Sequence, residues 1–133
     1  MIRLLAALAL AGSPAMAGSG AQAQSAAIGG LQCTGKPVTI RVSTIKPGQY
    51  AAFRKAAAAH QAWYAGHGNA TKVALVRLVK RSGSGASYDD GEAMTIVSYD
   101  SKPQPAHDAA YQAFVDAYQA SSSVKSEYRG CQG

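Results

Sequence analysis

A histidine on an apolar helix face is the plainest candidate for chemistry in this sequence. His60 lies in an alanine-rich stretch at helical spacing from Phe53 and Tyr64, so it shares their face. A histidine placed there could act as a general base, or as a ligand for haem iron or another metal. The alternative is a hydrogen-bonded histidine of the core or of a pocket wall. We take His60 as the one candidate catalytic residue and keep that alternative open.

The other two histidines are placed less well for chemistry. His67 follows His60 by seven residues, which is about 10 Å along a straight helix and too far for one ion to bind both. We expect His67 at the end of that helix and His107 at an exposed position where a second helix starts. The spacings H-x-x-x-H, C-x-x-C and E-x-x-H do not occur in the sequence. It therefore predicts no metal site, and we expect no bound cofactor.

Arginines inside expected strands and a surplus of tyrosine suggest a ligand. Arg41 and Arg77 could each anchor a carboxylate, or could be solvated side chains at a rim. Tyrosine outnumbers phenylalanine by 7 to 2, which suits a cavity with phenol donors and flat apolar walls. We expect a small planar aromatic or anionic ligand. The candidate ligand-binding residues are Arg41, Phe53, Tyr64, Arg77, Tyr99 and Tyr111.

The sequence lacks the residue patterns of several other kinds of catalytic site. The chain contains the residue types of a Ser–His–Asp triad, so its composition does not exclude one, but the G-x-S-x-G motif does not occur. The Gly83-Ser84-Gly85 stretch has no lysine to make it a phosphate-binding loop. Asp89 and Asp90 fall in an expected turn, and we expect Asp108 and Asp116 on the outer side of the second helix. No acidic pair is thus set for glycoside hydrolysis.

Residues 1–23 have the pattern of a secretory signal peptide. One positive charge at Arg3 precedes an apolar run, and two A-x-A sites end at Ala17 and Ala23. The run of about 8 residues is far shorter than the roughly 20 that span a bilayer. We predict cleavage at one of the two sites, a periplasmic or secreted mature chain, and no membrane span. The alternative is an uncleaved anchor or a buried N-terminal helix.

Composition and charge bound the remaining possibilities. The chain has 133 residues, 47% of them hydrophobic and 15% charged, so it is no disordered polyelectrolyte and has the length of one domain. The formal net charge is +6, but the basic residues are scattered along the chain. Nucleic-acid binding usually needs a dense basic stripe and a recognisable module, so we expect no nucleic-acid partner.

The sequence contains one pair of cysteines. Cys33 and Cys131 are 98 positions apart, near the two ends of the expected mature chain. In an oxidising compartment such a pair predicts a structural disulfide. A redox-active pair is the alternative, but such pairs usually lie close together in sequence. A disulfide would require the first and last elements of the domain to be neighbours.

Periodicity predicts six elements after a flexible segment at 24–35. Val38, Ile40 and Val42 alternate with polar residues, as in a half-buried strand. The expected order is strand 38–44, helix 49–65, strand 72–81, a Gly/Ser loop at 82–90, strand 92–99, helix 106–120 and strand 124–129. We therefore predict an α+β domain over 36–133 with the ferredoxin-like βαββαβ order, a four-stranded antiparallel sheet with two helices on one face. This topology places Cys33 beside Cys131.

One stretch of the chain resembles a known superfamily. A strand at 38–44 that ends in Lys46-Pro47-Gly48, a helix with Phe53 near its start, and strands at 72–81 and 92–99 are similar to the dimeric α/β-barrel superfamily, close to antibiotic-biosynthesis-monooxygenase-like domains. The resemblance spans about residues 36–129. It implies a homodimer with two sheets face to face and a pocket between sheet and helices. It also implies activities that range from cofactor-free monooxygenases to haem-degrading enzymes and decarboxylases.

Physical reasoning leads to a dimer as well. A sheet with both helices on one face leaves another face with Val, Leu, Ile or Met from at least two strands, and such a face is rarely left in water. The alternative is that one face is polar enough to be solvated, given Arg41, Arg77 and Lys80. Our leading hypothesis is an exported dimeric protein that binds a small ligand, or a cofactor-free monooxygenase. The alternatives are a non-catalytic interaction protein of the cell envelope and a haem-binding protein that uses His60.

Overall fold

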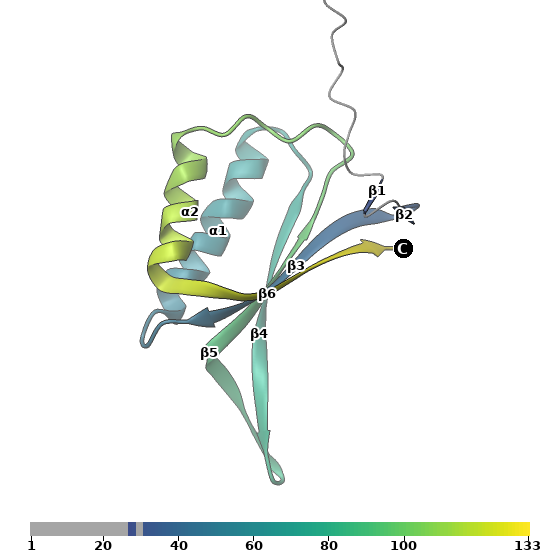
Figure 1. Ribbon diagram of the computed structural model, residues 1–133. Coiled ribbons are helices and arrows are strands. Elements are labelled where there is room, and N and C mark those ends of the chain that lie inside the picture. The colour runs from purple at the N-terminus through teal and green to yellow at the C-terminus, as the bar shows by residue number, and fades with distance from the viewer. Residues whose placement is uncertain (1–26, 29–30) are drawn as a thin grey trace, which may run out of the picture.

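Two helices cover one face of a four-stranded antiparallel sheet (Figure 1). The computed structural model describes residues 27–28 and 31–133, so the predicted signal peptide lies outside it. The strand order is β4-β5-β3-β6. The chain order β-α-β-β-α-β together with this strand order confirms the ferredoxin-like α+β fold. The elements of the domain are β3 (Lys36–Ile45), α1 (Tyr50–Gly66), β4 (Lys72–Ser82), β5 (Gly85–Ser98), α2 (Ala109–Ser121) and β6 (Ser122–Gln132).

A small hairpin precedes the domain. β1 (Ala27–Ile28) pairs with β2 (Leu31–Gln32), within the segment that we expected to be flexible. Directly after β2, Cys33 forms the predicted disulfide with Cys131, whose Cα lies 5.5 Å away. The disulfide joins the start of β3 to the end of β6, which run side by side and antiparallel. The cysteine spacing and the strand pattern thus lead to the same topology.

The side chains of the sheet divide into a helix-facing side and an open side. Val97 and Ala93 of β5 pack in the two core clusters with residues of the helices, so their cross-strand partners on β3, Thr39 and Ser43, also face the helices. The open side carries the alternate residues, which are mostly apolar. They are Val38, Ile40 and Val42 of β3, Ala74 and Val76 of β4, Met94 and Ile96 of β5, and Tyr128 of β6.

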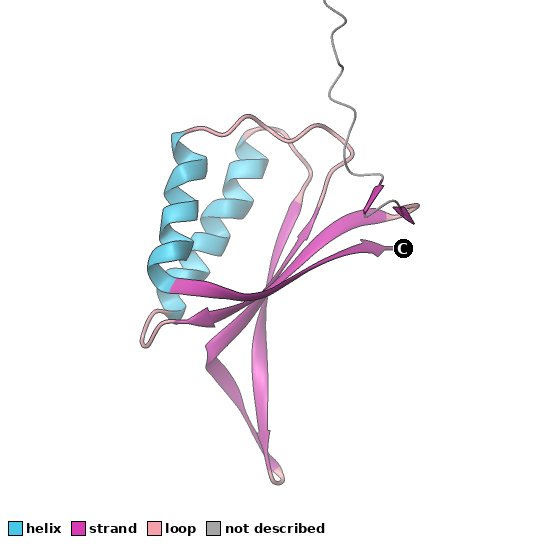
Figure 2. Cartoon of the chain, in the orientation of Figure 1, coloured by secondary structure: helices cyan, strands magenta, loops and turns pink. Residues whose placement is uncertain are grey.

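The hairpin of β4 and β5 differs from the expectation. We expected a loop at 82–90, but only Gly83 and Ser84 form the turn, and strand pairing runs down to Ser82 and Gly85. Gly83 has a φ of 58°, which the tight turn needs and which glycine adopts without strain. Residues 89–92, which we expected to begin with a turn, form an irregularity opposite β4. The result is a long arm that extends past the helices (Figure 2).

Helix α2 begins later than the periodicity suggested. We expected it from 106, but Pro103 and Pro105 keep the chain extended and Asp108 is the N-cap. Its carboxylate accepts a hydrogen bond from the backbone N–H of Tyr111, which satisfies one donor of the first turn. The preceding helix, α1, ends near Gly66, where Gly68 with a φ of 63° turns the chain toward β4.

Candidate functional site

A cavity of about 660 Å³ lies between the helix-facing side of the sheet and the two helices. It exists because α2 packs mainly on α1 and meets the sheet chiefly at β6, which follows it directly. The space over β3 is left open, since β3 presents Thr39, Arg41 and Ser43 there rather than large apolar side chains. The volume falls within the range of small-molecule sites.

Aromatic rings form the helix-side walls of this cavity. Ring pairs in edge-to-face or stacked geometry run through both helices, with Phe53 against Tyr118 at 5.2 Å and Trp63 against Phe114 at 5.8 Å between centroids. Such ring pairs hold one another in place along the walls. The wall residues are Phe53, His60, Trp63 and Tyr64 of α1 and Tyr111, Phe114 and Tyr118 of α2.

His60 lies in the middle of the aromatic wall. Its ring stacks on Phe114 with centroids 4.4 Å apart, and its Nδ1 lies 3.4 Å from the Tyr118 hydroxyl. Burial and, to a smaller degree, the charge of Arg41 lower the pKa of His60 to about 4. The ring is therefore neutral near pH 7, with the capacity to donate one hydrogen bond and accept another. A base whose conjugate acid is this strong suits hydrogen bonding better than removal of a proton from a weak acid.

Arg41 supplies positive charge to the cavity. Its Nε donates a hydrogen bond of 2.6 Å to Glu127 of the neighbouring strand β6. The side chains of the pair are 38% and 36% exposed, so both reach the solvent, and Arg41 also lines the cavity. The positive charge of Arg41 makes a lowering contribution to the pKa values of His60, Tyr64 and Tyr118. Arg41 therefore lies close enough to all three rings to act on them electrostatically.

The hydroxyls of Tyr64 and Tyr118, two of the cavity-lining residues, stay protonated. Burial, helped by Tyr99 and Tyr111, raises the pKa of Tyr64 to about 12. Burial also raises the pKa of Tyr118 far above its ordinary value. The Tyr64 hydroxyl donates to the side-chain oxygen of Gln104 at 2.8 Å. These phenols are donors at every physiological pH, which suits an acceptor-rich ligand.

The structure brings six of the seven candidate residues to this one cavity. His60, Arg41, Phe53, Tyr64, Tyr99 and Tyr111 all line it. Sequence reasoning did not include Tyr118 or Gln104 in the site, although Tyr118 follows Tyr111 at helical spacing. The pairing of Glu127 with Arg41 was also missed, because it depends on the register of β3 and β6.

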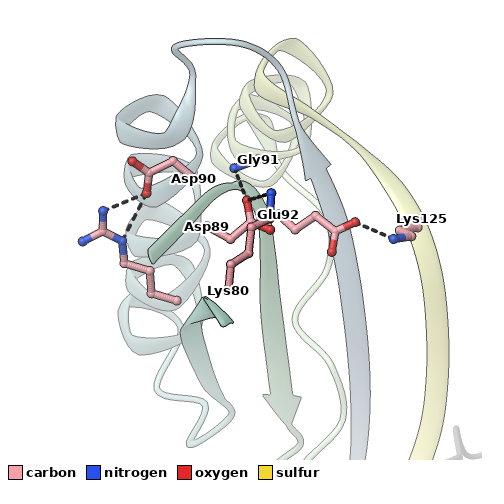
Figure 3. A network of polar contacts seen from close by, with 7 residues as sticks. Lys80, Asp89, Asp90, Gly91, Glu92 and Lys125 are labelled. Atoms are coloured by element: carbon pink, nitrogen blue, oxygen red, sulfur yellow. Dashed lines mark hydrogen bonds and ion pairs between the residues drawn. The ribbon is translucent and has the colours of Figure 1, made fainter. Parts of the chain in front are cut away.

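Arg77, the seventh candidate, lies outside the cavity. Its Nε and Nη2 both donate to one oxygen of Asp90, at 3.2 and 2.7 Å. Its guanidinium also lies over the rings of Tyr50 and Tyr88, 5.2 and 4.1 Å from their centroids. Asp90 belongs to a polar network at the base of the hairpin arm (Figure 3). In that network Lys80 pairs with the neighbouring Asp89 at 3.1 Å.

The remaining two histidines lie beside the N-terminus of α2. His67 is at the end of α1, as expected, and its two ring nitrogens lie 2.7 Å from the Trp63 carbonyl oxygen and 3.0 Å from the Asp108 carboxylate. Asp108 is therefore not on the outer side of α2, because it caps the helix and ties it to α1. His107 is exposed and stacks on Tyr111 with centroids 3.6 Å apart.

The chain matches no protein-family model, no curated protein and no solved structure. Among residues 27–28 and 31–133, no group of three or more His, Cys, Asp or Glu side chains gathers in a way that could hold a metal ion. Within the same residues, no helix is long and apolar enough to cross a membrane. The chemistry of the cavity is thus the basis on which its function is inferred.

Proposed function

We propose that the protein binds a small planar aromatic molecule that carries an anionic group. The observation behind this proposal is a cavity with aromatic walls whose lining includes the guanidinium of Arg41, and that of Arg129 beside it. The rings would stack on the flat apolar part of the ligand, and Arg41 would pair with its anion. The low pKa of His60 favours binding over a cofactor-free monooxygenase, because the ring is a weak base.

Titration with aromatic carboxylates of one to three rings, such as benzoate, 2-naphthoate and anthracene-9-carboxylate, tests this proposal. We expect saturable binding, with NMR shift changes at His60 and Tyr118. Arg41→Gln should weaken carboxylate binding about 10- to 100-fold, since it removes a charged hydrogen bond. The neutral amide of the same ring system should respond little to that substitution. Absence of saturation across the series, or shift changes confined to other surfaces, would overturn the proposal.

We further propose that two copies associate through the open side of the sheet. That side carries Ile40, Met94 and Ile96 at its centre, and Val76 and Tyr128 toward its edges are 38% and 60% exposed. The centre has no charge to repel a second copy of itself, so like faces can pack. This arrangement fits the dimeric α/β-barrel resemblance, and the disulfide is compatible with export to an oxidising compartment.

Analytical ultracentrifugation tests the dimer. We expect the wild-type protein to sediment as a dimer and Ile96→Glu to sediment as a folded monomer. Ala58→Glu, an exposed position on α1, is the matched control and should remain dimeric. A wild-type monomer at all concentrations would overturn this part of the proposal. The open side would then be the surface on which a non-catalytic envelope interaction protein could meet another partner.

A further inference from the structure

A row of three charged side chains, Arg41, Glu127 and Arg129, crosses β3 and β6, and the two arginines line the cavity. Arg41 lies opposite Glu127 in the strand register, and Arg129 follows Glu127 by two residues on the same side of β6. One carboxylate oxygen of Glu127 accepts from Arg41 Nε at 2.6 Å, and the other lies 3.8 Å from Arg129 Nε. The carboxylate is therefore shared between two guanidiniums that both line the cavity, while Glu127 itself is not part of the lining.

The contact between Arg41 and Glu127 leaves most of the guanidinium unused. Among the described residues, Glu127 is the acceptor found for Arg41, and it engages Nε but neither terminal amino group. A guanidinium binds a carboxylate best through two parallel hydrogen bonds. An ion pair with partners more than a third exposed also adds little to stability, so exchanging its carboxylate costs little.

We propose that Glu127 is an internal counter-ion, which occupies Arg41 while the cavity is empty and is displaced when the carboxylate of the ligand binds there. On displacement, Glu127 turns fully to Arg129, whose side chain is 69% exposed and free to follow it. This inference rests on the proposed function and deepens it. Glu127 becomes a specificity-determining residue, because it competes with anionic ligands and leaves neutral ring systems unaffected.

The exchange predicts a gain of affinity when the internal competitor loses its charge. Glu127→Gln should tighten binding of 2-naphthoate about two- to fivefold, the range that an exposed ion pair allows. Binding of 2-naphthamide should stay unchanged. Asp90→Asn is the matched control, since Asp90 pairs with an arginine of the same sheet outside the cavity, and it should change neither affinity.

Arg129→Gln distinguishes exchange from a simple change of the local field. If Glu127 turns to Arg129 on binding, Arg129→Gln weakens 2-naphthoate binding in the wild-type background, and that loss disappears when Glu127→Gln is already present. An equal loss in both backgrounds would overturn the exchange, and so would unchanged affinity in Glu127→Gln. If 2-naphthoate binds wild type in the cavity but these couplings fail, only the exchange is wrong. If it does not bind in the cavity at all, the proposed function fails first.

Discussion

Two arginine–carboxylate pairs on the same side of one sheet have different surroundings. Arg41–Glu127 and Arg77–Asp90 each join neighbouring strands, with closest distances of 2.6 and 2.7 Å and partly exposed side chains. Arg77 donates twice to its carboxylate and has aromatic rings against its face, whereas Arg41 donates once and borders a cavity. The guanidinium of Arg77 is held by two hydrogen bonds and two ring contacts, whereas that of Arg41 is held by one hydrogen bond and keeps its terminal amino groups for a ligand.

The difference arises from what each strand faces. Arg77 is on β4, next to the hairpin arm, where Tyr50 and Tyr88 lie close enough to pack on it. Arg41 is on β3 and lines the cavity between the sheet and α2. The aromatic rings across the cavity, such as His60 and Phe114, pack against one another. A charged residue in a strand therefore marks a binding site only where the packing around it is incomplete.

The largest expected effect comes from the disulfide. It links the start of β3 to the end of β6, the half of the sheet that borders the cavity, and lies away from the hairpin arm of β4 and β5. The double variant Cys33→Ser, Cys131→Ser should lose about 2–5 kcal/mol of unfolding free energy, measured by urea denaturation. Hydrogen exchange should accelerate more in the β3–β6 pairs near Arg129 than in the β4–β5 pairs near Arg81. An unchanged urea midpoint, or equal acceleration in both halves, would show that the disulfide does not hold the cavity half.

The next effect is the pH dependence of stability that His60, in the cavity wall, contributes. Burial holds the pKa of His60 at about 4, below the value of 6.5 in an unfolded chain. Between these values the unfolded state binds more protons than the folded state, so stability rises with pH and is lost as pH falls through this window. The loss should be on the order of 3 kcal/mol from pH 6.5 to pH 4.

Urea denaturation of His60→Gln at several pH values isolates this contribution. Below pH 6.5 its stability should fall less steeply than that of wild type. His107→Gln, at an exposed position, is the matched control and should keep the wild-type slope. If His60→Gln also keeps the wild-type slope, the imidazole is not held neutral by the cavity. The acid sensitivity would then come from carboxylates such as Asp108, whose pKa is lowered by the backbone N–H of Tyr111.

The sequence allowed the fold and most of the cavity to be predicted, because both follow from local patterns. Helical spacing placed His60, Phe53 and Tyr64 on one face, and strand alternation put Arg41 on the side opposite Ile40. The hairpin arm was missed since Ser and Gly residues are typical of loops, while cross-strand pairing such as Val79 with Tyr88 overrides that preference. The pairing of Glu127 with Arg41, and the pairing of Arg77 with Asp90 outside the cavity, were missed. Both depend on contacts between strands, which no local pattern encodes.

The smallest expected effects test the comparison of the two arginines most directly. Arg77→Gln should lower the urea midpoint slightly, because it removes two hydrogen bonds and the contacts with Tyr50 and Tyr88. It should leave 2-naphthoate affinity unchanged. Arg41→Gln should do the reverse, with a nearly unchanged midpoint and a large loss of affinity. If instead both variants lose affinity, the hairpin arm takes part in binding and the cavity is not the whole site, since Arg77 does not line it.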